Sequence, residues 1–275
     1  MIVFPNAKIN IGLNILRKRP DGYHDLETVM IPAPWTDILE IVPGAGAEDT
    51  LACSGRSVAC PPEKNLVMKA VKALRKIVDF PPVDVFLEKI IPDGAGLGGG
   101  SADAAFTISA INELFGLGLD KRNLVETASK VGADCPFFIY NEPALCTGTG
   151  TTITQFHIKL PHEAHIAIIK PDISVPTAQA YAGVTPRDNR APLAGVLSET
   201  PIEEWQGTVR NDFEASIFPI HPGIAEIKEE LLRQGAIYAA MSGSGSAVYG
   251  IFLKDGLFKP LPGCNCYLYK KLEKV

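Results

Sequence analysis

Alternating apolar and polar residues near the start of the chain predict a β-strand. Between residues 8 and 15 every second residue is Ile or Leu, and the residues between them are Lys8, Asn10, Gly12 and Asn14. One face of this strand is therefore apolar, and the other carries a lysine and two asparagines. Such a polar face either points to solvent or lines a polar cleft, and its composition favours solvent.

The same periodicities, together with Gly and Pro breakers, predict the elements that follow. Helices are expected over residues 65–78, 101–115, 121–131, 175–183 and 222–234. Strands are expected over residues 37–42, 83–91, 164–169, 237–241, 247–252 and 266–269, a turn over 17–25, and mostly loops over 188–207. Mixed runs of strands and helices indicate an α+β fold. The length of 275 residues favours two domains, which we place at residues 1–155 and 156–275.

Charge and hydropathy exclude several classes of protein. The chain has 26 Lys and Arg against 31 Asp and Glu, a net charge of −5, so it lacks the basic surface expected of a nucleic-acid-binding protein. No basic start is followed by a long apolar run, and the apolar stretch 236–252 is broken by Ser and Gly. We therefore expect no signal peptide, no membrane partner and a cytoplasmic location. Phosphate ligands are not excluded, because their sites are built from backbone N–H groups and one or two cations.

The six cysteines lack the paired C-x-x-C spacing of zinc sites. Reduced, partly buried thiols are the favoured interpretation. Cys264 and Cys266 form a C-x-C pair, for which a metal role is the less favoured alternative.

A glycine-rich segment between the strand at 83–91 and the helix at 101–115 is the strongest local signal. It has five glycines in the seven residues 94–100. Glycines allow close backbone approach, and N–H groups at a helix N-terminus attract anions, so the segment predicts a phosphate-binding loop rather than a simple tight turn. Ser101 could cap the helix and touch a phosphate, whereas the helix dipole is enough to account for Asp103. The predicted loop comprises Pro92, Asp93, Gly94, Ala95, Gly96, Leu97, Gly98, Gly99, Gly100, Ser101 and Ala102.

Two common phosphate-binding motifs do not fit this loop. No Gly-Lys-Ser/Thr closes it, so it is not a Walker loop. It contains G-x-G-x-x-G, but a second predicted helix follows the first where a dinucleotide-binding fold requires a strand that ends in an acidic residue.

Three segments give the chain a resemblance to a known family. Residues 5–10 read Pro-Asn-Ala-Lys-Ile-Asn, residues 92–105 contain the glycine-rich loop, and residues 241–247 read Met-Ser-Gly-Ser-Gly-Ser-Ala. In this order they resemble the motifs of the GHMP small-molecule kinases. The resemblance implies a two-domain α+β fold with the active site in the cleft between the domains, and phosphoryl transfer from ATP to a hydroxyl group. Mg²⁺ is implied by the ATP chemistry.

Further segments narrow the resemblance within the family. Residues 21–24, 132–138 and 211–214 are similar to members that phosphorylate the 2-hydroxyl of the methylerythritol moiety of a CDP-alditol, in the non-mevalonate route to isoprenoids. The alternatives are a GHMP kinase of the homoserine or mevalonate type and a non-catalytic nucleotide-binding protein. The expected partners are the CDP-alditol and ATP, and the expected state is a monomer or weak homodimer.

The resemblance also assigns roles to individual residues. Asp134 matches the catalytic base, although the residues alone favour a loop cap there. Lys8 matches the cation that accompanies it, and Asn10 shares the face of Lys8 and would bond the substrate. Asn65 and Leu66 would border the adenine.

The substrate's cytidine end is assigned by resemblance as well. Tyr23 and His24 match a cytosine-contacting pair, and Tyr181 matches a second aromatic wall, so that Tyr23 and Tyr181 would sandwich the base. Thr177 lies one helical turn before Tyr181 and would face the substrate. No metal ligand is assigned.

Overall fold

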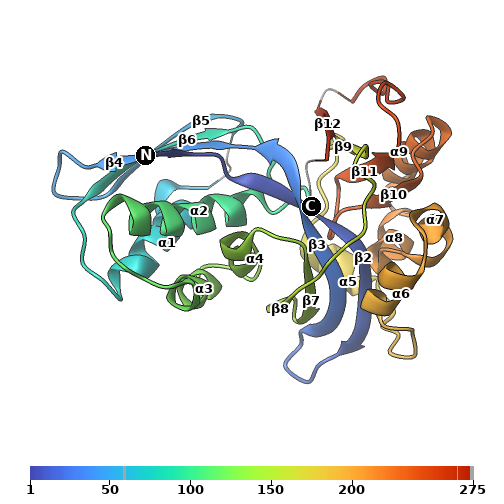
Figure 1. The fold of residues 1–275 in the computed structure, drawn as a ribbon, viewed down its shortest axis with the longest axis horizontal. Helices are drawn as coiled ribbons and strands as arrows, with labels where there is room; N and C mark the ends of the chain where they lie inside the picture. Colours follow the sequence, from blue (N-terminus) through green and yellow to red (C-terminus); the bar gives the residue numbers. More distant parts are fainter. Residues whose placement is uncertain (58–59, 265, 273–275) are drawn as a thin grey trace. The chain divides into compact units, whose positions relative to one another are not determined.

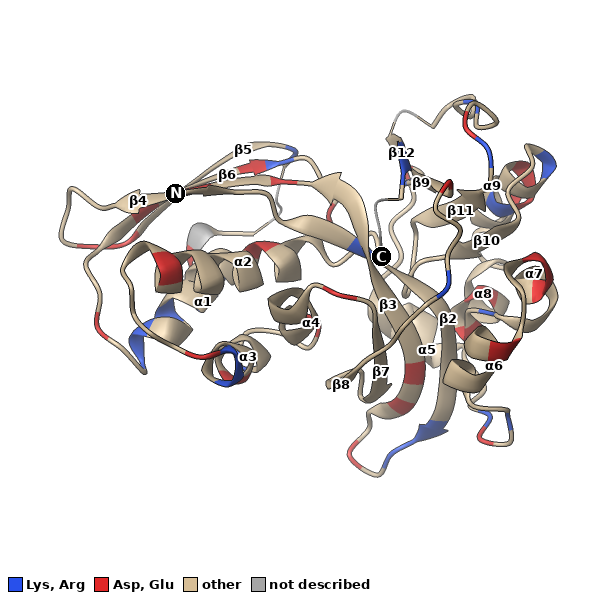
Figure 2. Ribbon diagram, viewed as in Figure 1, with Lys and Arg blue, Asp and Glu red and all other residues tan. Residues whose placement is uncertain are grey.

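The computed structural model describes residues 1–57, 60–264 and 266–272, which form two compact units that interleave along the chain (Figure 1). Unit 1 consists of residues 1–7, 35–93 and 98–141, and unit 2 of residues 8–34, 94–97 and the remainder from 142. The units are thus not two successive halves of the chain, and the division near residue 155 stays a prediction. Figure 2 shows Lys and Arg interspersed with Asp and Glu over both units.

Unit 1 is a four-stranded sheet with helices on one face (Figure 1). Its strand order is β1 (Ile2–Val3), β4 (Ile38–Pro43), β6 (Val83–Lys89) and β5 (Thr50–Gly55). The first three are antiparallel, and β5 runs parallel to β6. The helices are η1 (Pro62–Lys64), α1 (Leu66–Arg75), α2 (Gly99–Leu114), α3 (Lys121–Ser129) and α4 (Cys135–Tyr140). Alternate residues of β6, including Val83, Val85 and Leu87, are buried in a core shared with α1 and α2.

Unit 2 contains two four-stranded sheets. One has the order β2 (Asn6–Lys18), β3 (His24–Thr36), β7 (Ala144–Gly148) and β8 (Thr152–Gln155). The other has the order β10 (Tyr238–Met241), β11 (Val248–Phe252), β9 (His165–Ile169) and β12 (Tyr267–Lys271). The helices are α5 (Thr177–Ala182), α6 (Leu193–Glu199), η2 (Ile202–Glu204), α7 (Trp205–Thr208), α8 (Asp212–Ile217) and α9 (Pro222–Arg233).

The predicted strand at residues 8–15 forms within β2, but the expectation that its polar face points to solvent is wrong. Lys8, Asn10 and Asn14 are 3%, 2% and 7% exposed. The face is covered because residues distant in sequence bond to it: Thr28 to Asn10, and Arg190 to Asn14. The alternation reveals that one face is polar, whereas only the tertiary fold determines what covers it.

All five predicted helices are present, but the loop predicted at 188–207 contains α6, η2 and α7. The sequence patterns also missed these elements: β1, β3, β5, β7, β8, η1, α4 and α8. In β3 the run from Leu26 to Ile31 is buried on both faces, so it lacks the alternation that identifies a half-buried strand.

Candidate active site

The glycine-rich loop connects β6 to α2, as predicted. Gly94, Gly96 and Gly98 have φ angles of +59°, +76° and +72°, the left-handed region that side chains disfavour. Gly98 is the N-cap residue of α2, which begins at Gly99. Left-handed residues immediately before a helix turn successive N–H groups toward one point, where the positive end of the helix dipole also acts. The geometry therefore fits a site for an anion such as phosphate.

A second loop, residues 241–247, supports the part of the glycine loop that belongs to unit 2. The hydroxyl of Ser242 donates to the carbonyl of Gly96 at 2.9 Å, and the N–H of Ala247 donates to the carbonyl of Ala95 at 3.1 Å. A Cβ on Gly96 would collide with the carbonyl oxygen of Ser242. The segment that the sequence singled out without a specific role thus holds the glycine-rich loop in position.

Lys8 lies in a buried hydrogen-bond network in unit 2. Its ammonium donates to Oδ1 of Asn10 at 2.6 Å, and Nδ2 of Asn10 donates to Thr28 Oγ1 at 3.0 Å. The Thr28 hydroxyl donates to the carbonyl of Gly12 at 2.5 Å, and Tyr249 Oη donates to the carbonyl of Asn10 at 2.7 Å. Neither Thr28 nor Tyr249 is among the predicted site residues, since β3 was not predicted and nothing in the sequence connects β11 with β2. Together these bonds fix the orientation of the Asn10 amide and of Lys8.

Asp134 precedes α4 in unit 1. It occupies the N-cap position, but its side chain makes no capping hydrogen bond to α4, which argues against the loop-cap interpretation. The next residue, Cys135, is hydrogen-bonded to the hydroxyl of Ser101 in the first turn of α2, and burial raises the pKa of the Cys135 thiol to about 11. Asp134 therefore lies near the end of α2 that carries the glycine loop.

Three rings gather in unit 2 near the residues assigned to the cytidine. His24 stacks on Tyr181 with ring centroids 5.0 Å apart and an angle of 28°. Tyr181 meets Phe213 edge-on at 4.8 Å. Tyr23 is 66% exposed, so His24 is the ring that lies against Tyr181. The hydroxyl of Thr177 lies 3.2 Å from that of Ser244, which joins α5 to the 241–247 loop.

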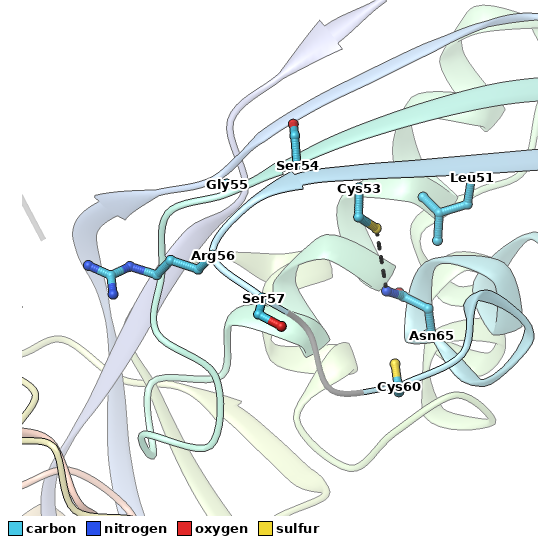
Figure 3. A pocket seen from close by; sticks show the side chains of 8 residues that line it. All are labelled: Leu51, Cys53, Ser54, Gly55, Arg56, Ser57, Cys60 and Asn65. Atoms are coloured by element: carbon cyan, nitrogen blue, oxygen red, sulfur yellow. Dashed lines mark hydrogen bonds between the residues drawn. The ribbon is translucent and has the colours of Figure 1, made fainter.

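A cavity of about 370 Å³ opens beside the N-terminus of α1 (Figure 3). Asn65 caps α1, with its Oδ1 accepting from the N–H of Val67 at 2.9 Å, and its Nδ2 points toward Cys53. Leu66 is 3.5 Å from where a Cβ on Gly100 would lie, so the start of α1 touches the glycine loop's end. The cavity is lined by Leu51, Cys53, Ser54, Gly55, Arg56, Ser57, Cys60 and Asn65.

Comparison with known proteins decides the family. Residues 65–142 match the GHMP kinases N terminal domain, and residues 202–257 match the GHMP kinases C terminal domain. The chain is 46% identical over 272 residues to the 4-diphosphocytidyl-2-C-methyl-D-erythritol kinase of Porphyromonas gingivalis, covering 99% of each chain. It is 48% identical over 271 residues to the protein of that name in Parabacteroides distasonis, covering 98% of each. The chain belongs to the GHMP kinase family.

Solved structures agree with this assignment. A crystal structure of a 4-(cytidine 5'-diphospho)-2C-methyl-D-erythritol kinase is 29% identical and superposes with a TM-score of 0.78, covering 94% of this chain and 92% of that one. A homoserine kinase from Cytophaga hutchinsonii, 17% identical, has a TM-score of 0.67 and covers 92% of this chain and 86% of that one, which shows the shared fold alone. The predicted α+β GHMP kinase fold is confirmed. The chain is thus a small-molecule kinase with ATP as co-substrate.

Proposed function

We propose that the chain transfers the γ-phosphoryl group of ATP to the 2-hydroxyl of 4-diphosphocytidyl-2-C-methyl-D-erythritol, a step of the non-mevalonate route to isoprenoids. Its identity of 46–48% with proteins named for this kinase, over nearly the whole chain, carries the proposal. Its identity with the homoserine and mevalonate kinases of similar fold is only 13–17%. A non-catalytic role is disfavoured because both Lys8 and Asp134 are present.

In the proposed reaction the phosphates of ATP bind the glycine loop at the N-terminus of α2. Asp134 takes the proton from the acceptor hydroxyl as its oxygen attacks the γ-phosphorus, and ADP leaves from the opposite side. Lys8 supplies positive charge to the transferred group, and Asn10 bonds the alditol. The network through Thr28 supports this role, because it holds a buried ammonium in one orientation.

We propose that the adenine occupies the cavity beside Asn65 and Leu66, and that the cytosine stacks on the His24–Tyr181 pair. The centroids of these two rings are 5.0 Å apart, so the base does not lie between His24 and Tyr181, and a sandwich between Tyr23 and Tyr181 stays a prediction. Thr177 would then contact the substrate from the helix that carries Tyr181.

Mg²⁺ would arrive with ATP. No group of three or more His, Cys, Asp or Glu among residues 1–57, 60–264 and 266–272 could hold a metal ion. That residue set fits a cation held mainly by phosphates and water, as is common for Mg²⁺ in kinases, and it identifies no protein ligand. When bound, the ion would neutralise phosphate charge.

The location and assembly state stay proposals. No helix among the described residues is long and apolar enough to cross a membrane. The cytoplasmic location and the monomer or weak homodimer rest on the sequence alone.

The direct test is a kinase assay with a panel of acceptors. Purified protein with Mg-ATP should phosphorylate 4-diphosphocytidyl-2-C-methyl-D-erythritol in strong preference to homoserine and mevalonate. Methylerythritol phosphate, which lacks the cytidine, should be a poor acceptor, because remote binding energy positions the reacting hydroxyl. Preference for homoserine or mevalonate would replace the proposal with another GHMP activity, and no turnover on any acceptor would refute catalysis.

Tyr181→Ala should weaken binding of the CDP-alditol by about 5- to 150-fold, because one stacking partner of a base contributes about 1–3 kcal/mol. The affinity for ATP should hardly change. Tyr181→Phe keeps the ring and serves as the matched control. Calorimetry with both ligands checks this, and a loss confined to ATP would assign Tyr181 to the donor site instead.

Thr28→Val should lower kcat by about tenfold, because the Asn10 amide and Lys8 lose their fixed orientation. It also leaves Asn10 Nδ2 and the Gly12 carbonyl unpaired, which should reduce the free energy of unfolding by about 1–3 kcal/mol. Thr28→Ser retains the hydroxyl and should restore both values. A folded Thr28→Val enzyme with normal kcat would limit the network to a structural role.

A further inference from the structure

Three buried charged residues, which we call the Lys89 cluster, lie at the base of the glycine loop in unit 1. The ammonium of Lys89 donates to Oδ2 of Asp103 at 2.7 Å and to a carboxylate oxygen of Asp37. Lys89, Asp37 and Asp103 are 4%, 0% and 2% exposed. The sequence attributes Asp103 to the helix dipole, but in the structure its main interaction is with the buried ammonium of Lys89.

The Lys89 cluster connects the two stems of the glycine loop. Oδ1 of Asp37 accepts from the N–H groups of Ile90 at 2.5 Å and Ile91 at 2.7 Å, where the chain leaves β6. Asp103 lies on the other stem, in the second turn of α2. A Cβ on Gly99 would lie 3.0 Å from the Ile91 side chain and 3.4 Å from Nζ of Lys89, so the cluster sits directly against the start of the helix.

The charges within the cluster do not balance. One ammonium faces two carboxylates, a net charge of 1 − 2 = −1 when both are ionised. Oδ1 of Asp103 is buried and has no hydrogen-bond partner among the described residues. Burial, followed by opposing effects of Lys89 and Asp37, raises the pKa of Asp103 to about 7. This oxygen is therefore the position at which the cluster can accept a proton.

The elements packed around Asp103 bring few other titratable groups to it. Cys53 faces it from β5, and burial followed by the nearby Asp103 carboxylate raises the pKa of that thiol. The thiol of Cys135 in α4 is hydrogen-bonded to Ser101. The residues that α1, α3 and β4 bury are uncharged. Protonation of Asp103 is thus governed mainly by Lys89, Asp37 and any anion that binds at the end of α2.

We propose that Asp103 takes up a proton when the phosphates of ATP bind the glycine loop, so that nucleotide binding and proton uptake are linked. This rests on the proposed function, which places the triphosphate there. Asp103 is four residues beyond Gly99, about 6 Å along the helix axis at 1.5 Å per residue. At that separation in a partly dry interior, a polyanion strongly disfavours a second negative charge. Protonation of Asp103 makes the cluster neutral. The Lys89 ammonium then pairs with the one remaining carboxylate, that of Asp37.

The sign of the effect follows from the charges. Bound phosphate raises the pKa of Asp103 further, so by linkage ATP must bind more tightly as the pH falls. If bound phosphate raises the pKa of Asp103 from about 7 to about 8, ATP binds about fivefold more tightly at pH 6 than at pH 8. The same increase corresponds to uptake of about 0.4 proton per ATP at pH 7.

Calorimetry on the whole chain tests this inference. ATP with excess Mg²⁺ is titrated at pH 6, 7 and 8, and at pH 7 in two buffers of different ionisation enthalpy. The wild type should take up a fraction of a proton per ATP, and Asp103→Asn should lose this uptake together with the associated pH dependence. Glu113→Gln, an exposed carboxylate on the same helix, makes the same charge change and should behave like the wild type. The titration of ATP itself is common to all three proteins and cancels in the differences.

Each result decides the matter. Equal proton uptake by wild type and folded Asp103→Asn overturns the inference but leaves the kinase proposal intact. If Asp103→Asn does not fold, the wild-type measurement at pH 8 decides, because ATP with excess Mg²⁺ carries no titrating proton there, and no net uptake at that pH overturns the linkage. Failure of the wild type to bind ATP at any pH overturns the proposed function as well.

Discussion

Asp134→Asn should retain the fold and bind both substrates, yet lose about 10²- to 10⁴-fold in kcat, the usual contribution of a positioned general base. The amide keeps the size of the carboxylate but cannot take the proton of the acceptor hydroxyl. Since the Asp134 side chain makes no capping hydrogen bond to α4, the substitution should not unfold that helix. Steady-state kinetics, with thermal unfolding to verify the fold, provides the measurement.

Asp79→Asn is the matched control for this prediction. Asp79 is an exposed carboxylate of the same unit, in the segment after α1, and removing its charge should leave kcat unchanged. A folded Asp134→Asn enzyme with nearly normal kcat would show that Asp134 is not the base.

Gly96→Ala should weaken ATP binding by at least about tenfold and reduce kcat/KM for ATP accordingly. The new Cβ must occupy a left-handed conformation, which costs about 1–2 kcal/mol, and it collides with the backbone carbonyl of Ser242. The collision cannot be relieved by a side-chain rotation, so the phosphate-binding loop has to move. Calorimetry with ATP and kinetics at varied ATP concentration measure the effect.

Gly116→Ala is the control that distinguishes the effect of backbone strain from the effect of displacing the glycine loop. Gly116 has a φ of +58°, and nothing lies within 4 Å of the position that its Cβ would take. This variant should lose stability through strain alone while ATP affinity stays normal. If Gly96→Ala bound ATP as tightly as Gly116→Ala, the glycine loop would not be the phosphate site.

The parts of the site that depend on local chemistry could be read from the sequence. Gly94, Gly96 and Gly98 adopt left-handed conformations before a helix, and an anion site at a helix N-terminus needs little else. Asp134 is different, because the residues around it favour a loop cap and only the family resemblance pointed to a base. In the structure the Asp134 side chain makes no capping hydrogen bond to α4, and its role as the base stays a prediction.

The features of the site that could not be predicted from the sequence depend on contacts between residues far apart in the chain. The polar face of β2 was assigned to solvent because its cover, including Thr28 and Tyr249, comes from other strands. Asp103 was assigned to the helix dipole because its partner Lys89 lies on a different element. In both cases the pattern identified the polar residue correctly, but not what surrounds it.

The interleaved course of the chain also has a consequence for synthesis. Leu13, Ile15 and Leu26 belong to the same hydrophobic core as residues that are translated more than 200 positions later, including Phe252 and Phe258. The hairpin of β2 and β3 leaves the ribosome first and must wait, with its apolar residues uncovered, until β10, β11 and α9 have been made. During that interval it is a surface to which chaperones bind and at which incomplete chains aggregate. Chains terminated before β11 cannot complete this core, and quality control in the cell should therefore recognise them as unfolded.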